Sequence, residues 1–461
     1  GISTLSSLKF TDTNIKIGST ALDSLTTGTQ NVALGENALT AATTGQENTA
    51  VGNDALAANT TGSYNVAVGR LTLDANTTGT LNVAVGMHAL GGNTTASSNT
   101  AIGHDALKAN TTGTQNVAAG TYALDANTTA NNNSAFGYAA LSANTTGVNN
   151  TAIGFAALDA NTTAGNNTAV GGAALGANTT ATGGTALGAQ SLEANTTGNY
   201  NTAVGMQSLE SNQTGTDNVA VGYYAMQANL ASNNVAVGRR ALAANTTGAQ
   251  NTAIGNNALD ANTTASYNTG VGADALGANT TGTNNVALGR DAGKTQTTLN
   301  GCTWIGTSAG QVNIASNNTG VGAGALYSNT TGTHNTALGT GVYGSTQGAL
   351  GSNTTGDHNT AVGSRSLVLN STGSSNTAVG DRALQANTTQ SNNTAVGYRT
   401  LISNSTADQN TAVGADAMYT NSTGEYNVAM GYMALYSNTT ASNNVAIGYQ
   451  ALLLNTTGTN N

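Results

Sequence analysis

The sequence predicts an all-β protein of the parallel β-solenoid class. A 17-residue repeat runs through nearly the whole chain, apolar residues within it alternate with period two, and Gly and Asn-Thr-Thr punctuate each repeat. Repeats built from helix pairs are longer than this, and leucine-rich repeats need at least about 20 residues. The alternation and the turn residues predict strand, turn, strand, turn in each repeat. Because one coil cannot bury its own apolar face, stacked coils must form the core.

The repeat reads N-[TV]-A-[VIL]-G-x-x-A-L-x-[AS]-N-T-T-[GA]-x-x, and we number its positions 0 to 16 from the first asparagine. Its anchors run from Asn14 to Asn461, with 27 anchors and 26 complete intervals. At about 4.8 Å per coil, these intervals predict a rod on the order of 125 Å long. The last anchor is followed by no cap. We therefore expect a segment of a longer polypeptide, or an end that stacks on a neighbouring molecule.

The composition excludes several classes of protein. Of the 461 residues only 7% are charged and 4% aromatic, with 60 Gly, one Cys and no Pro. Disordered chains lack apolar residues and carry charge and Pro, collagen needs Gly at every third position, and one Cys cannot form a disulfide framework. A net charge of −9 argues against nucleic acid. No apolar run reaches the roughly 20 residues of a membrane helix.

The period-two rule assigns side chains to faces. We assign positions 1, 3, 8 and 10 to the interior, for example Val66, Val68, Leu56 and Ala58. Positions 0 and 2 should then face outward, yet they stay Asn and Ala through nearly every coil. Such a small, uniform face predicts contact with another chain, and a purely structural ladder of Asn amides that bond from coil to coil is the alternative. The predicted interchain face includes Asn65, Ala67, Asn82, Ala84, Asn99 and Ala101.

Departures from the repeat define the expected organisation. Residues 1–13 form an N-terminal cap or a join, residues 14–284 and 359–461 are regular coils, and residues 285–358 are irregular, with an insertion at 340–348. Two coils are one residue short and share a substitute corner, Asn229–Asn233 and Asn313–Asn317. In the irregular zone Gly293 and Gly310 replace the interior Leu, and Cys302 and Trp304 replace Asn and Ala.

Few residues suggest chemistry. His334 and His358 lie on successive coils with Asp357 beside them, which makes them a weak candidate for a metal site. His88 and His104, one coil apart, are weaker still. Arg365, Arg382 and Arg399 occupy position 6 of three successive coils and form a candidate ligand edge for an anionic glycan or a neighbouring filament. The repeat places no nucleophile with a base, no phosphate loop and no paired carboxylates, so we expect no enzyme and no cofactor.

The Asn-Thr-Ala-Val-Gly and Asn-Val-Ala-Ile-Gly cores resemble the head repeats of trimeric autotransporter adhesins. The longer run N-T-A-V-G-x-x-A-L-x-A-N-T-T-G-x-x-N is similar to repeat tracts of phage tail fibres and bacterial surface fibres. The resemblance covers about residues 14–461. It implies a left-handed β-roll assembled as a parallel homotrimer. It also implies a structural or attachment role in an extracellular fibre. The 17-residue coil departs from the shorter coils of the adhesin heads.

The expected function is therefore the structural shaft of an extracellular fibre that mediates attachment, on a virion or a cell surface. The expected partners are copies of the same chain and a cell-surface glycan or receptor. One alternative is a self-polymerising or bundled bacterial surface filament. Another is an ice-binding solenoid, which needs a flat threonine array. Adjacent corner threonines such as Thr60 and Thr61 must point different ways, which argues against that array.

Overall fold

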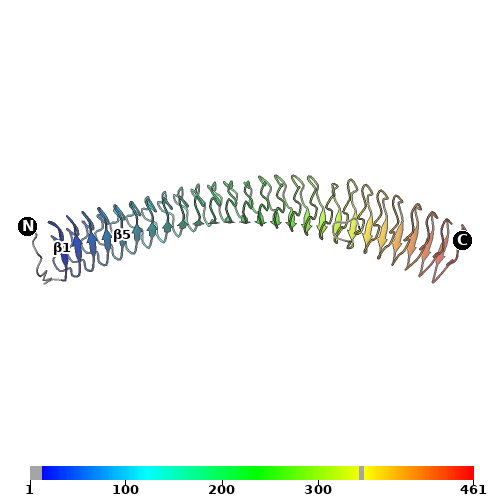
Figure 1. The fold of residues 1–461 in the computed structure, drawn as a ribbon, viewed down its shortest axis with the longest axis horizontal. Coiled ribbons are helices and arrows are strands. Elements are labelled where there is room, and N and C mark those ends of the chain that lie inside the picture. The colour runs from blue at the N-terminus through cyan, green and yellow to red at the C-terminus, as the bar shows by residue number, and fades with distance from the viewer. Residues whose placement is uncertain (1–12, 342–346) are drawn as a thin grey trace, which may run out of the picture. The chain divides into compact units, whose positions relative to one another are not determined.

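The computed structural model describes residues 13–341 and 347–461. The chain divides into two compact units, one ending at Tyr223 and the other beginning at Tyr224. Each unit is a stack of single coils (Figure 1), and each coil contributes one three-residue strand. The strands of the first unit are β1 Ile15–Ile17, β2 Val32–Leu34, β3 Thr49–Val51, β4 Val66–Val68, β5 Val83–Val85, β6 Thr100–Ile102, β7 Val117–Ala119, β8 Ser134–Phe136, β9 Thr151–Ile153, β10 Thr168–Val170, β11 Thr185–Leu187, β12 Thr202–Val204 and β13 Val219–Val221.

The second unit repeats this plan. Its strands are β14 Val235–Val237, β15 Thr252–Ile254, β16 Thr269–Val271, β17 Val286–Leu288, β18 Thr303–Ile305, β19 Thr319–Val321, β20 Thr336–Leu338, β21 Thr360–Val362, β22 Thr377–Val379, β23 Thr394–Val396, β24 Thr411–Val413, β25 Val428–Met430 and β26 Val445–Ile447. Within each unit the strands pair in parallel with the strands of neighbouring coils. The predicted parallel β-solenoid is thus confirmed.

Strand register is kept across the irregular coils of the second unit. Equivalent residues pair across the ordinary 17-residue step, as Thr49 pairs with Val66. They also pair across the shortened coil, where Thr303 pairs with Thr319, and across the insertion, where Thr336 pairs with Thr360. The insertion therefore leaves the pairing of β20 with β21 in register. Residues 342–346 of that insertion, and residues 1–12 of the expected cap or join, lie outside the described part of the chain.

The predicted second strand is wrong. Positions 5 to 10 form a series of turns in which positions 6 and 8 adopt left-handed backbone, as in Asp54 (φ 58°) and Leu56 (φ 52°). Alternating left-handed residues cannot form an extended strand. Neighbouring coils support these turns by backbone bonds, for example from the Leu56 N–H to the Thr72 carbonyl (3.0 Å). The apolar pattern placed Leu correctly in the core but gave no sign of the left-handed turns.

The face assignment of the strand is also wrong. Positions 0 and 2 point inward, and Asn65 and Ala67 are 0% exposed, whereas positions 1 and 3 point outward and are half-buried or exposed. The core consists of Ala at position 2, Ala at position 7 and Leu at position 8, with Asn at positions 0 and 11. Position 10, assigned to the interior, is half-buried in Ala58. Coils this narrow have room for Ala but not Val on the inward face of the strand.

Two ladders of asparagine amides run through each unit, and they explain why Asn can be buried. At position 0 the Asn48 Nδ2 donates to Asn31 Oδ1 (3.1 Å) and to the Gly62 carbonyl (2.9 Å). At position 11 the Asn76 Nδ2 donates to Asn59 Oδ1 (2.9 Å) and to the Gly79 carbonyl (3.1 Å). Buried polar groups with their partners in place cost little. The Asn ladder that the sequence offered as an alternative is therefore the correct reading.

The irregular zone keeps a full core by exchanging large and small residues. Trp304 fills a position normally held by Ala and is 0% exposed, and its indole N–H donates to Gln296 Oε1 (3.0 Å). A Cβ atom at Gly293 would lie 2.6 Å from Trp304 Cδ1, and one at Gly320 would lie 2.9 Å from Cε3. Gly310 borders the same ring. The glycines that replace Leu and Ala in these coils therefore make room for one tryptophan.

Candidate functional surfaces

The predicted interchain face lies inside the coils and cannot touch another chain. All six of its residues, Asn65, Ala67, Asn82, Ala84, Asn99 and Ala101, are 0% exposed in the single chain. The uniformity of positions 0 and 2 has an internal cause. Ala fits the narrow core, and Asn forms the ladder.

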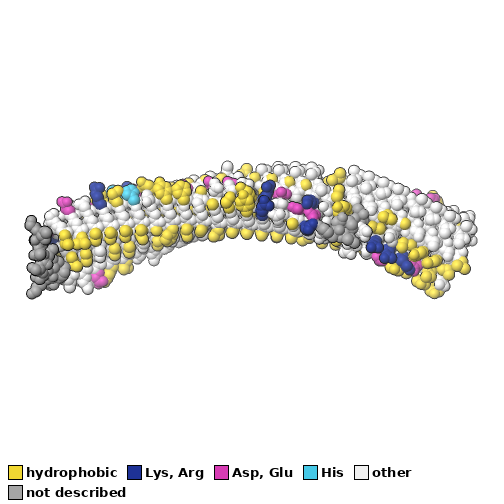
Figure 2. All heavy atoms as spheres, in the orientation of Figure 1, with side chains coloured by type: hydrophobic (Ala, Val, Ile, Leu, Met, Phe, Trp, Pro, Cys, Tyr) yellow, Lys and Arg dark blue, Asp and Glu magenta, His cyan; other side chains and the backbone are white. Residues whose placement is uncertain are grey.

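The outward side of the strands, positions 1 and 3, is the surface that remains; we name it the strand face. Position 3 is apolar in all 26 strands, and position 1 is Thr, Val, Ser or Ile in every strand. Large side chains on it are substantially exposed, including Ile102 (47%) and Ile153 (40%). Figure 2 shows rows of hydrophobic side chains that follow the stack. A row of exposed apolar side chains of this length usually marks an interaction site.

The two histidines of the candidate metal site meet, but a third ligand does not join them. The rings of His334 and His358 stack with centroids 5.1 Å apart and an interplanar angle of 8°. The Asp357 carboxylate instead accepts hydrogen bonds from Thr333, from its backbone N–H (2.6 Å) and its hydroxyl (3.2 Å). Among residues 13–341 and 347–461, no group of three or more His, Cys, Asp or Glu side chains is arranged to hold a metal ion.

The arginine column lies on one ridge, as its spacing predicts. The Arg382 backbone N–H bonds to the Ser364 carbonyl, and the Arg399 N–H bonds to the Asp381 carbonyl. Acidic neighbours offset much of its charge. Arg399 Nη2 donates to Asp416 Oδ2 (3.1 Å), and Arg399 Nε forms an ion pair with Asp416 Oδ1 at 2.9 Å. Arg382 Nε lies 3.7 Å from Asp381 Oδ2.

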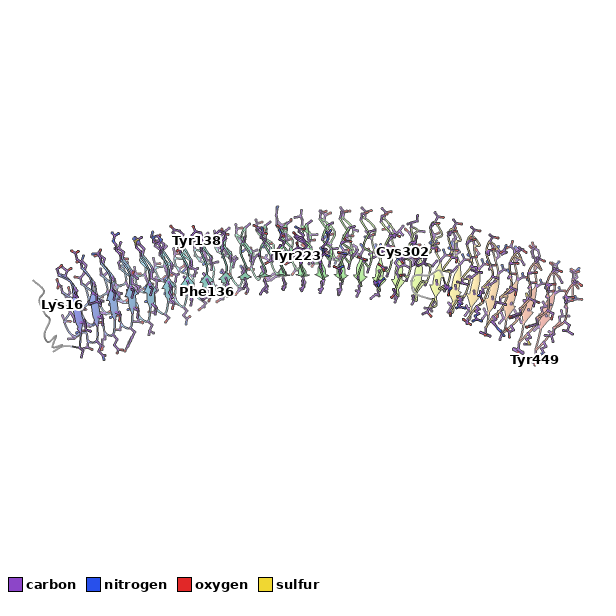
Figure 3. The ribbon with its side chains drawn as sticks, viewed as in Figure 1. Lys16, Phe136, Tyr138, Tyr223, Cys302 and Tyr449 are labelled. Carbon is purple, nitrogen blue, oxygen red and sulfur yellow. The ribbon has the colours of Figure 1, made fainter. Side chains whose placement is uncertain are left out.

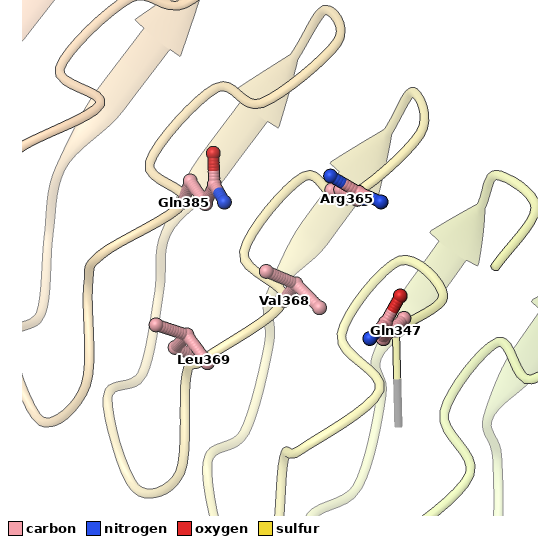
Figure 4. Close-up of a pocket in the computed structure, with 5 residues that line it drawn as sticks. All are labelled: Gln347, Arg365, Val368, Leu369 and Gln385. Atoms are coloured by element: carbon pink, nitrogen blue, oxygen red, sulfur yellow. The ribbon is translucent and has the colours of Figure 1, made fainter. Parts of the chain in front are cut away.

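Arg365, the first member of this column, borders a shallow groove with a volume of about 280 Å³. Gln347, Val368, Leu369 and Gln385 complete its lining (Figure 4). The column is therefore mostly a set of local ion pairs, with one cation beside a groove.

Aromatic rings form a strip on five successive coils of the first unit, at positions 5 and 6. The ring centroids of His88, His104, Tyr122, Tyr138 and Phe155 follow one another at 6.4, 5.7, 5.8 and 5.7 Å; we name these five residues the aromatic strip. Tyr138 and Phe136 lie at different edges of the stack in Figure 3. The strip is thus separate from the strand face.

Sequence reasoning missed the aromatic strip, although the sequence carried its signal. Positions 5 and 6 vary freely in the repeat, so ring side chains there on five consecutive coils are not required by the coil itself. For two of these rings, His88 and His104, the sequence suggested a role, and that role was a weak metal site. The structure places both beside Asp105, with Nδ1 to carboxylate distances of 4.0 Å from His88 and 3.5 Å from His104.

Comparison of the sequence with protein-family models and with curated proteins finds no match. No helix in the described ranges is long and apolar enough to cross a bilayer. The fold and its surfaces therefore carry the functional argument.

Proposed function

We propose that this chain is a structural shaft of an extracellular fibre that mediates attachment, and that copies of it pack side by side through the strand face. The single observation that carries the proposal is that the strand face has no charged residue at position 1 or 3 in any of the 26 strands. Solvent-facing strands normally carry polar and charged residues, which keep them from associating. A protein that must remain single would not leave this surface uncharged throughout.

The size of the strand face suits a stable assembly. Thirteen strands in each unit, at about 4.8 Å per coil and with a width of roughly 10 Å, give on the order of 600 Å² per unit. A standard interface uses about 800 Å² from each partner. The repeat also favours a second copy of the chain as the partner. Because both copies have the same distance between coils, their strand faces can make the same contact at every coil. The resemblance to trimeric fibres favours three copies.

The test is the mass of the assembly before and after charge is placed on the strand face. We expect the wild type to have a native mass three times 45.3 kDa. The double variant Ile102→Lys/Ile153→Lys should be monomeric with an unchanged circular dichroism spectrum, because both side chains are exposed. The matched control Thr112→Lys/Thr163→Lys, at an exposed corner of the same coils, should keep the wild-type mass.

Three outcomes would count against the proposal or change it. A monomeric wild type contradicts assembly, and a Lys pair that leaves the mass unchanged contradicts the strand face as its site. Electron microscopy of the same sample separates discrete fibres from open-ended filaments. Open-ended filaments would support the alternative of a self-polymerising surface filament.

A further inference from the structure

We propose that the Phe155 end of the aromatic strip, together with the groove beside it, binds a segment of a neutral polysaccharide. This inference names a ligand class and a site for the attachment role proposed above, and it rests on that role. Phe155 ends the strip and is 64% exposed, and Tyr138, whose ring lies stacked on it at an interplanar angle of 10°, is 51% exposed. Exposed, ordered rings of this kind offer flat apolar surfaces for a ligand.

The coil after Phe155 leaves a free shelf next to its ring. Position 5 of that coil is Gly172, where an added Cβ atom would have no atom within 4 Å. The two coils are held together there by a bond from the Ala173 N–H to the Phe155 carbonyl (2.9 Å). The ring series therefore stops at a step that no side chain covers. A sugar ring has the size and the flat C–H face to continue the series on this step.

A shallow groove with a volume of about 530 Å³ adjoins the shelf. Alanines from successive coils form its lining, and Asp159 and Glu193 contribute the carboxylates; we name it the acidic groove. Gly176 lies on the coil between these two acids. A Cβ atom there would lie 3.6 Å from Asp159 Oδ1, so the glycine leaves that carboxylate open to the groove. Carboxylates accept hydrogen bonds from hydroxyl groups, which sugars supply in pairs.

The local charge argues against an anionic ligand. No Lys or Arg occurs anywhere from residue 109 to residue 238, and the acidic groove carries two carboxylates. Sulfated, phosphorylated or uronic polymers would meet only repulsion there. Burial also raises the pKa of Asp159, whose own backbone bonds act against the rise. A protonated Asp159 could donate to a sugar oxygen as well as accept, so either form suits a hydroxyl-rich ligand.

The test is calorimetric titration with neutral hexasaccharides of glucose in α and β linkage, mannose, galactose and N-acetylglucosamine. We expect at least one to bind the wild type with a Kd on the order of 1 mM. Phe155→Ala should weaken that binding about tenfold. Gly172→Phe should block it by covering the shelf, with no loss of a native contact. Tyr432→Ala, which removes a stacked ring in the other unit, is the matched control and should bind like the wild type.

The result that overturns the inference is clear. If no hexasaccharide binds at about 10 mM, or if Phe155→Ala and Gly172→Phe bind as well as Tyr432→Ala, the site is not a glycan site. Binding of a hexauronate with equal affinity would contradict the neutral ligand. The monomeric Ile102→Lys/Ile153→Lys variant should still bind. Binding and assembly are therefore separate readouts, and failure of one is distinguishable from failure of the other.

Discussion

The asparagine at position 0 holds each coil to the one before it. The Asn48 side chain and its own backbone N–H both bond to Asn31 Oδ1, at 3.1 and 3.0 Å, while Nδ2 also reaches the Gly62 carbonyl. One side chain thus joins the strand, the preceding coil and the opposite corner. Neither Asp nor Leu could replace it, because Asp lacks the donor and Leu lacks both groups. Removal would leave buried groups unsatisfied, at about 1–3 kcal/mol each.

Ala84 provides the first prediction at this scale. Ala84→Trp should destabilise the fold by at least about 1–3 kcal/mol. Leu73, Leu90 and Ala101 occupy the positions that are glycine around Trp304, so an indole at residue 84 has no room. The measurement is the free energy of unfolding in guanidinium. Val85→Trp is the matched control, since Val85 points outward and is 37% exposed. Equal stability of the two variants would mean that Ala84 is not a core residue.

The sequence predicts much at the residue scale but not the phase of the strand. Gly at position 4, Leu at position 8 and the Asn ladder could all be recognised from the repeat. Period-two alternation states only that Val66 and Ala67 point to opposite sides, and hydrophobicity then favours Val inside. What decides the matter is the width of the core and the bonds available to an inward Asn, and both depend on the neighbouring coils. The groove at Asp159 likewise arises only when coils stack.

At the scale of the coil, corners can change while the strand stays in register. The two shortened coils use the same corner, in which the Asn229 and Asn313 side chains each donate to a carbonyl two residues later, at 2.8 and 2.6 Å. The sequence predicted this shared turn because the two corners carry nearly the same residues, Asn-Leu-Ala-Ser-Asn and Asn-Ile-Ala-Ser-Asn. Trp304 shows a second kind of change, in which glycines on its own coil and on the two neighbouring coils compensate for one large residue.

Gly310 tests this compensation. Its φ of 57° is the value that Leu adopts at the same position elsewhere, so Gly310→Leu meets no backbone obstacle and fails only by collision with Trp304. We expect it to destabilise the protein by about 1–3 kcal/mol. The double variant Gly310→Leu/Trp304→Ala should recover part of that loss, because it restores the consensus pair. Additive effects in this double-mutant cycle would contradict the exchange.

At the scale of the molecule, four half-buried aspartates should set the pH dependence of stability. Burial raises the pKa of Asp74, Asp125, Asp159 and Asp260, all at position 9. A carboxyl with a raised folded-state pKa binds protons more tightly when folded. Its contribution is therefore greatest below the ordinary value of about 3.9 and is lost as pH rises through the folded pKa. Burial also acts to raise the pKa of Asp291, but bonds from Lys294 and Arg290 outweigh it and leave that pKa lowered, with the opposite effect.

Four aspartates have a raised pKa and one, Asp291, has a lowered pKa. We therefore expect the free energy of unfolding to rise as pH is lowered from about 7 towards 4. Guanidinium denaturation across this range measures it. Asp159→Asn should reduce the slope, because no charged neighbour contributes to the shift of Asp159. Stability that falls steadily over the same range would contradict the burial of these carboxyls.

The 17-residue spacing of the bonds between coils also has a mechanical consequence. Within a unit, bonds such as Val66 N–H to the Asn82 carbonyl (2.8 Å) join each coil only to its neighbours. A force applied along the stack therefore breaks the hydrogen bonds between one pair of neighbouring coils at a time. The coils unfold one after another while the remaining coils stay folded. Each released coil adds about 55 Å of extended chain. A tether built this way would lengthen under load in many small steps of equal length. The work absorbed by these unfolding steps would lower the peak force at the attachment point during a sudden pull.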